Sequence, residues 1–138
     1  MSKFFYLVSA LLMCLAPLST AAGHIVCGGD QADGGSILRP LFDGGFIAAG
    51  YTASFSNGAN DIWVLKLSSQ DKVAWQKVYG GKDNDYPTDI REAPDGGFIL
   101  CGCTRSYGSG SEDSWVLRLD PKGRIMWQKV FGGSGRDV

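Results

Sequence analysis

Residues 61–67 read DIWVLKL, and residues 113–119 read DSWVLRL, which is the same stretch 52 positions later. The spacing holds on both sides, because DGGFI at 43–47 recurs at 95–99 and WQKVYGG at 75–81 recurs as WQKVFGG at 127–133. Comparison of residues 28–79 with residues 80–131 gives 22 identities in 52 positions without a gap. Self-similarity at a fixed period of this length indicates a repeat architecture.

The repeat divides the chain into five segments. We predict a signal peptide at 1–22, the end of a preceding repeat strand at 23–27, complete units at 28–79 and 80–131, and the start of a third unit at 132–138. A chain that stops this early in a third unit favours a truncated product of a longer protein. A ring assembled from several copies of the chain is the alternative.

Each unit predicts four short strands and no helix. A turn of the form Asp-Gly-Gly joins the first strand to the second, since glycine tolerates the positive φ that tight hairpins need. The apolar residues follow no 3.6-residue period outside the leader. The predicted strands are Ser36–Phe42, Phe46–Thr52, Asp61–Leu67 and Val73–Tyr79, then Thr88–Pro94, Phe98–Thr104, Asp113–Leu119 and Ile125–Phe131, with turns at Asp43, Gly44, Gly45 and at Asp95, Gly96, Gly97.

The strands are apolar on both faces. Phe46 and Ala48 alternate with Ile47 and Ala49, and the third strand alternates in the same way. A sheet of four strands covers neither of its own faces, so we expect neighbouring units to cover them. Large indole rings contribute most to such an interface. We therefore assign packing between units to the four tryptophans, Trp63, Trp75, Trp115 and Trp127.

Four strands in a unit of this length are typical of a β-propeller blade. The sequence thus predicts an all-β chain with two four-stranded antiparallel propeller blades and the start of a third, in an incomplete β-propeller. A β-sandwich built by duplication is the alternative.

The first 22 residues have the features of a secretory leader. Lys3 precedes an apolar run over residues 4–18, and small residues follow up to Ala22. This order predicts a signal peptide cleaved after Ala21 or Ala22, with an uncleaved membrane anchor as the alternative. We therefore expect a secreted, periplasmic or cell-surface protein with no membrane contact after cleavage.

Charge excludes some partners. Thirteen Lys and Arg residues oppose fourteen Asp and Glu residues, which gives a net charge of −1. A protein that binds nucleic acid through its phosphates needs a basic surplus, so we expect no nucleic-acid partner. An apolar content of 44% also excludes a disordered chain.

Residues able to carry chemistry are few. His24 is the only histidine of the sequence, which argues against a Ser-His-Asp hydrolase. Asp83 and Asp85 have oxygen ligands at calcium-like spacing, but the stretch lacks the Gly and the later Glu of an EF-hand loop. They are weak candidates for calcium, and we predict no catalytic residue and no cofactor otherwise.

Three cysteines follow the leader: Cys27, Cys101 and Cys103. An odd number cannot pair completely within one chain, although an oxidising compartment permits disulfides. Buried thiols that pack as small apolar groups are the favoured interpretation. A bridge from Cys27 to one of the other two, metal binding and redox chemistry stay open.

The motifs resemble a known family. The sequence DGGFIAAGYT at 43–52, with DIWVLKL and WQKVYGG, is similar to the repeats of secreted bacterial and archaeal β-propeller proteins. The stretch LDPKGRIMW at 119–127 resembles the tryptophan-docking motif of quinoprotein-like propellers. That resemblance implies that Trp75 and Trp127 each pack against a neighbouring blade. The first unit departs from the motif, since it has Ser68-Ser69-Gln70-Asp71 where the second has Asp120-Pro121-Lys122-Gly123.

Two functions follow as expectations. The first is a non-catalytic module that acts in structure or in protein or glycan contact, with further blades in cis or copies in trans as partners. Aromatic side chains are its candidate ligand contacts: Tyr51, Phe55, Tyr86 and Tyr107. The alternative, carried only by the resemblance, is a fragment of a dehydrogenase propeller that uses pyrroloquinoline quinone.

Overall fold

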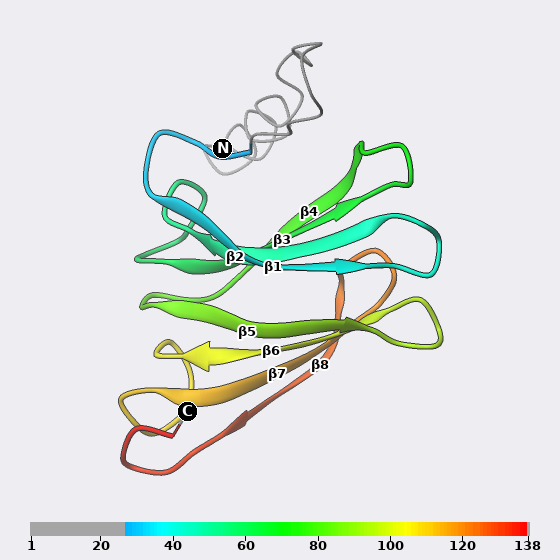
Figure 1. Cartoon of the computed structure of the whole chain (residues 1–138). Coiled ribbons are helices and arrows are strands. Elements are labelled where there is room, and N and C mark those ends of the chain that lie inside the picture. The colour runs from blue at the N-terminus through cyan, green and yellow to red at the C-terminus, as the bar shows by residue number, and fades with distance from the viewer. Residues whose placement is uncertain (1–26, 138) are drawn as a thin grey trace.

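The computed structural model describes residues 27–137, which form two four-stranded antiparallel sheets and no helix. The predicted signal peptide lies outside the described residues, as do positions 23–26. Within the described part of the chain, no helix is long and apolar enough to span a bilayer. The strands are β1 (Asp33–Pro40), β2 (Phe46–Thr52), β3 (Asp61–Leu67), β4 (Val73–Tyr79), β5 (Asp85–Glu92), β6 (Phe98–Thr104), β7 (Asp113–Leu119) and β8 (Ile125–Phe131) (Figure 1).

Each sheet is a meander in which consecutive strands pair. The first sheet has the order β1-β2-β3-β4, and the second sheet has the order β5-β6-β7-β8. The pairings of the second sheet reproduce those of the first, 52 residues later. Phe46 pairs with Leu67 in the first sheet, for example, and Phe98 pairs with Leu119 in the second. Six of the eight strands have the predicted bounds, and the all-β prediction is confirmed for the described residues.

The first strand of each unit was predicted too late in the chain. β1 and β5 begin at Asp33 and Asp85, and they end at Pro40 and Glu92 rather than at Phe42 and Pro94. In the first unit, Leu41 and Phe42 belong to the turn and not to the strand, because the N–H of Leu41 donates to the carbonyl of Gly45 at 2.9 Å. A bulge near the middle of each strand interrupts the two-residue alternation that predicts a strand from sequence.

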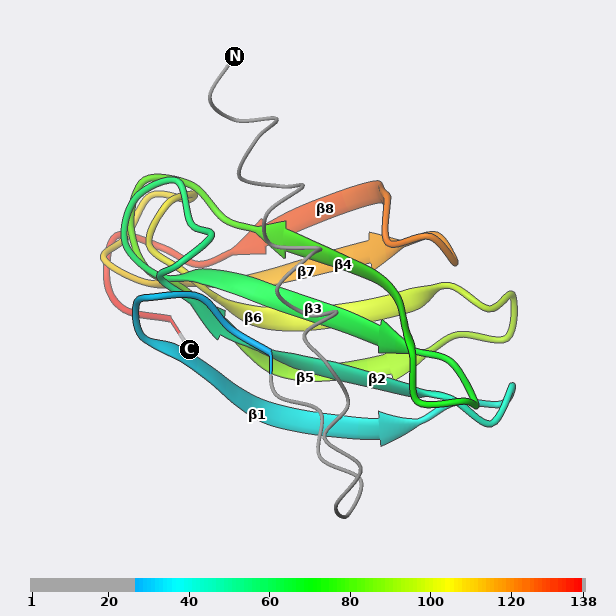
Figure 2. The same cartoon turned by 90° about the horizontal axis from the view of Figure 1, so that it is seen from above.

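The two sheets stack face to face, as the two views show (Figures 1 and 2). The core lies between them. The first sheet contributes one face of β2, β3 and β4, while the second sheet contributes Ile90 and one face of β6 and β7. The buried core side chains are Leu41, Ile47, Ala49, Ile62, Val64, Tyr79, Ile90, Phe98, Leu100, Trp115, Leu117 and Leu119.

The sheets use opposite faces for this contact. Ile47 and Ala49 of the first sheet lie in the core, but the second sheet contributes Phe98 and Leu100. These last two correspond, at an offset of 52, to Phe46 and Ala48, which lie on the other face of β2. The front of one sheet therefore packs against the back of the next. This stacking is heterologous, and such a contact leaves an unmatched face at each end.

We predict that stability depends on the buried face of β7 and not on exposed apolar side chains. Leu117→Ala removes a side chain that is 0% exposed, whereas Leu38→Ala removes one that is 58% exposed. The first change is expected to lower the free energy of unfolding by about 2–5 kcal/mol. The second is expected to change it by less than about 0.5 kcal/mol. Urea unfolding followed by circular dichroism measures both, and equal losses would contradict the assignment of the core.

Candidate functional site

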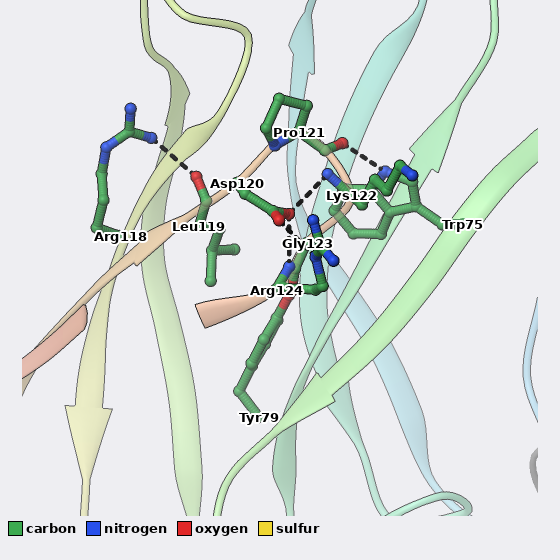
Figure 3. Close-up of polar contacts among 9 residues, drawn as sticks. All are labelled: Trp75, Tyr79, Arg118, Leu119, Asp120, Pro121, Lys122, Gly123 and Arg124. Carbon is green, nitrogen blue, oxygen red and sulfur yellow. Dashed lines mark hydrogen bonds and ion pairs between the residues drawn. The ribbon is translucent and has the colours of Figure 1, made fainter. Parts of the chain in front are cut away.

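The clearest specific contact between the sheets joins Trp75 of β4 to the turn between β7 and β8 (Figure 3). We call this turn, Asp120–Gly123, the docking turn. The indole N–H of Trp75 donates to the carbonyl oxygen of Pro121 at 3.0 Å. Four residues further along β4, the hydroxyl of Tyr79 donates to the carbonyl oxygen of Gly123 at 2.6 Å. Two aromatic side chains of the first sheet therefore bind two carbonyl groups of one turn of the second, those of Pro121 and Gly123.

The Tyr79 hydroxyl keeps its proton. Burial raises the pKa of Tyr79 above its usual range, and the charge of Asp120 adds to this effect. Since only the protonated hydroxyl donates a hydrogen bond, the contact with Gly123 persists at neutral pH.

The docking turn needs glycine for two reasons. Gly123 has a φ of 75°, in the left-handed region that favours glycine. The ring of Trp75 also lies directly over it, because a Cβ atom on Gly123 would stand 2.9 Å from Cζ3 of Trp75. Carbon atoms in contact are normally separated by about 3.5–4.0 Å. Any side chain at this position therefore displaces the indole.

Asp120 shapes the docking turn. Its Oδ1 accepts the N–H groups of Lys122 at 2.8 Å and Arg124 at 2.9 Å. The N–H of Arg124 is the largest favourable influence on the carboxylate, and it holds the pKa of Asp120 below its usual value of 3.8. The turn is thus formed by local hydrogen bonds before any neighbour is considered.

The first sheet has a turn of the same backbone shape at Ser68–Asp71. Ser68 takes the place of Asp120, with its Oγ accepting the N–H groups of Gln70 and Lys72, each at 3.3 Å. The closing bond also matches, since the N–H of Asp71 donates to the carbonyl of Ser68 at 3.0 Å and that of Gly123 to Asp120 at 3.0 Å. Asp71 adopts the left-handed φ of 57° in the position of Gly123.

The four predicted tryptophans lie in different environments. Trp115 is buried between the sheets, and its indole N–H donates to Gln128 at 3.1 Å. Trp63 makes the matching bond to Gln76, but it lies on the face of β3 turned away from the second sheet. Trp75 lies on the docking turn, while Trp127 lies on the outer face of the second sheet and is 44% exposed. The structure therefore brings Trp75 and Trp115 to one interface and leaves Trp63 and Trp127 on the two outward faces.

The aromatic side chains expected to contact ligands pack mainly within the protein. Tyr51 and Tyr86 meet edge to face with ring centroids 5.6 Å apart. Phe55 packs on Trp63 at 5.4 Å, and Tyr107 packs on Trp115 at 5.1 Å. Tyr107 is the most exposed of these four, at 42%, and its hydroxyl donates to the carbonyl of Gly80 at 3.0 Å.

The repeated aspartates hold loop backbone. Asp43 and Asp95 accept the N–H of the second glycine of their own turns, at 2.9 and 3.0 Å. Asp33, Asp85 and Asp137 accept the N–H of a glycine four residues earlier, at 2.8, 2.9 and 2.6 Å. Asp61, Asp85 and Asp113 also lie buried at the loop end of the sheets, which the sequence did not predict.

The two calcium candidates, Asp83 and Asp85, lie in different environments. Oδ2 of Asp85 accepts the hydroxyl of Ser106 at 2.6 Å, whereas Asp83 has an exposed side chain and contacts Ser106 through its backbone N–H and carbonyl groups. Among residues 27–137, no three His, Cys, Asp or Glu side chains are grouped as a metal ion requires. Cys27, Cys101 and Cys103 are half-buried free thiols, so the structure contains no bridge among them. Burial raises the pKa of Cys101 and of Cys103 above the usual value.

Comparison of the sequence with protein-family models gives no match, and comparison with curated proteins gives none either.

We predict that a side chain at Gly123 disrupts the docking turn and that one at Gly96 does not. The two glycines have nearly the same φ, 75° and 80°, but a Cβ on Gly96 meets only Pro121, at 3.8 Å. Asparagine tolerates this backbone, so backbone strain is matched between the two variants. Gly123→Asn is expected to lower the free energy of unfolding by about 1–3 kcal/mol more than Gly96→Asn. Equal losses in chemical denaturation would show that the Trp75 ring does not require an empty position.

We also predict that the charge of Asp61 destabilises the fold. Burial raises the pKa of Asp61 above 3.8, the negative charge of Asp85 adds to this, and the N–H of Asn57 opposes it. The folded state therefore holds the Asp61 proton more tightly than the unfolded state, and this group costs stability as pH rises above 3.8. Asp61→Asn carries no such charge. The stability of Asp61→Asn relative to the native chain is expected to increase as pH rises through this range, and a constant difference between the two urea-unfolding curves would refute it.

Proposed function

We propose that this chain is a secreted or cell-surface β-propeller repeat module, in which each four-stranded sheet serves as one blade. Its role is structural or lies in protein or glycan contact, rather than in catalysis. Further blades, supplied in cis or by copies in trans, are its partners.

The observation that carries this proposal is the heterologous stacking of the two sheets. A sandwich of two sheets packs like faces inward and completes its core. Here the front of the first sheet covers the back of the second, and the same contact can be repeated with a further sheet. Blades around a propeller axis have this front-to-back relation.

The outer face of the second sheet supports the proposal. It carries the side chains that correspond to the docked face of the first sheet, and two of them are strongly exposed. Trp127 is 44% exposed and Phe131 is 55% exposed, whereas Tyr79, the counterpart of Phe131, is 6% exposed. Exposed aromatic side chains on a contiguous face mark an interaction surface. The face includes Ile99, Cys101, Val116, Trp127 and Phe131, together with the polar side chains of Ser114, Arg118 and Lys129.

The loops suit a contact role. The loops that follow β2 and β6 lie at the same end of the stacked sheets (Figure 2). Tyr107, in the second of these loops, presents a half-exposed ring. In repeat proteins, variable loops on one rim of a rigid stack are the usual place for binding.

Hydroxyl-radical footprinting tests the proposal. The protein recovered from the cells that express it naturally is compared with the chain produced alone, and the oxidation of Trp127 and Phe131 is measured by mass spectrometry. We expect both residues to be protected in the natural material and oxidised in the isolated chain, with the protein recovered outside the cytoplasm. Tyr79 serves as the internal control and stays protected in both samples. Equal oxidation of Trp127 in the two samples would contradict the proposal.

A further inference from the structure

The outer face of the second sheet is a docking surface without its partner turn among the described residues. Trp127 occupies the position of Trp75, and Phe131 occupies the position of Tyr79. Trp75 docks on a turn that ends in glycine, whereas Trp127 is 44% exposed and has the Nζ of Lys129 at 5.7 Å from its ring centroid. Because the front of the first sheet packs against the back of the second, we expect Trp127 to pack against the back of another sheet with a comparable turn.

The first sheet of a second copy offers the back face but a different turn. Its turn, Ser68–Asp71, has the backbone of the docking turn and a side chain at the last position. A Cβ at the matching position of the docking turn stands 2.9 Å from Cζ3 and 3.0 Å from Cη2 of the docked indole. Asp71 places both a Cβ and a carboxylate there. Since a clash with a packed ring forces either partner to move, Asp71 works against docking of Trp127.

Phe131 increases the importance of a glycine at the end of the partner turn. Tyr79 adds a second anchor through its hydroxyl, which donates to the carbonyl of Gly123. Phe131 has no hydroxyl and cannot donate this bond. Of the two aromatic positions, only Trp127 can therefore donate to the partner turn a hydrogen bond like that of Trp75.

We propose that the outer face of the second sheet binds a further four-stranded sheet of this repeat whose turn between third and fourth strands ends in glycine. Asp71 is the residue that excludes the first sheet of a second copy from this position. This inference rests on the proposed function and narrows its partners, because it keeps a further blade with a glycine turn and excludes the first sheet of a copy in trans. The outer face of the second sheet thereby distinguishes a sheet whose turn ends in glycine from the first sheet of another copy, so copies of the chain do not join at random.

An extended chain tests the inference. Residues 132–138 correspond to residues 80–86, so a second copy of residues 87–131 appended after Val138 keeps the 52-residue spacing of the full chain. Three versions differ only in the appended copy of the docking turn. This copy keeps its glycine or carries the change Gly123→Asp or Gly123→Asn, while Gly123 of the original chain is unchanged in all three. The asparagine version separates the effect of a side chain from that of a charge. Tryptophans are labelled with 5-fluorotryptophan, and Trp127→Phe and Trp75→Phe variants assign their ¹⁹F resonances.

The readout is the solvent-isotope shift of the Trp127 resonance between H₂O and D₂O. We expect this shift in the unextended chain, its loss in the glycine version, and its retention in the aspartate and asparagine versions. Protection of Trp127 in all three versions would overturn the glycine requirement. The exclusion of a second copy would be overturned if Trp127 of the unextended chain became protected as protein concentration rises. Sedimentation would then show self-association of the unextended chain that Trp127→Phe removes.

The resonance of Trp75 keeps the two failures apart. If Trp75 is protected in every version while Trp127 stays exposed in the glycine version, the inference fails and the stacking behind the proposed function stands. If Trp75 itself is exposed in the unextended chain, the stacking fails, and the proposed function fails with it.

Discussion

A sheet of four strands that is apolar on both faces has no stable form alone, and this constraint governs the whole structure. Successive side chains of β2 and β3 point to opposite faces of the sheet and are mostly apolar. Each face therefore needs another layer to cover it. The first sheet covers the back of the second, and the contact is fixed by Trp75 lying on the docking turn. Burial supplies the free energy, while the two hydrogen bonds of Trp75 and Tyr79 determine which turn meets which strand.

Polar contacts add orientation at the opposite edge of the same interface. Arg39 of β1 and Asp89 of β5 form an ion pair at 2.9 Å, and Oε2 of Glu92 accepts the N–H of Phe42 at 2.8 Å. The side chains of the ion pair are partly exposed, so it contributes little to stability. Together with the docking turn, these contacts fix the sheets at separated points, which limits sliding of one apolar face over the other.

Much of the fold was predictable because its signals are local. The third strand is bounded by Asp61 and by the turn after Leu67, and no bulge interrupts its pairing with β2, so its limits follow from the sequence. The first strand was placed too late because the bulge between Gly35 and Ile37 breaks that period. A bulge arises from pairing with β2, which is a contact between distant residues and leaves no clear mark in the strand itself.

The contact between Trp75 and the docking turn was predictable in part. The resemblance to a tryptophan-docking motif indicated that Trp75 packs on a neighbour, but its acceptor, Pro121, lies 46 residues away and is defined only by the stacking. The difference between Asp71 and Gly123 was visible as a departure from the repeat. Its consequence became clear only when the distance from that position to the indole ring was known. Burial of Asp61 and Asp85 had no sequence signal, because aspartate at a turn is usually exposed.

The position of the Trp75 ring over Gly123 tests the central claim most directly. Nuclear magnetic resonance of the full chain reports it through the α-protons of Gly123, which an indole ring above them shifts upfield by its ring current. The account predicts strongly upfield-shifted Gly123 α-protons with nuclear Overhauser effects to the Trp75 ring. Ordinary glycine shifts at Gly123, with no Overhauser effect between these two residues in a folded chain, would contradict it.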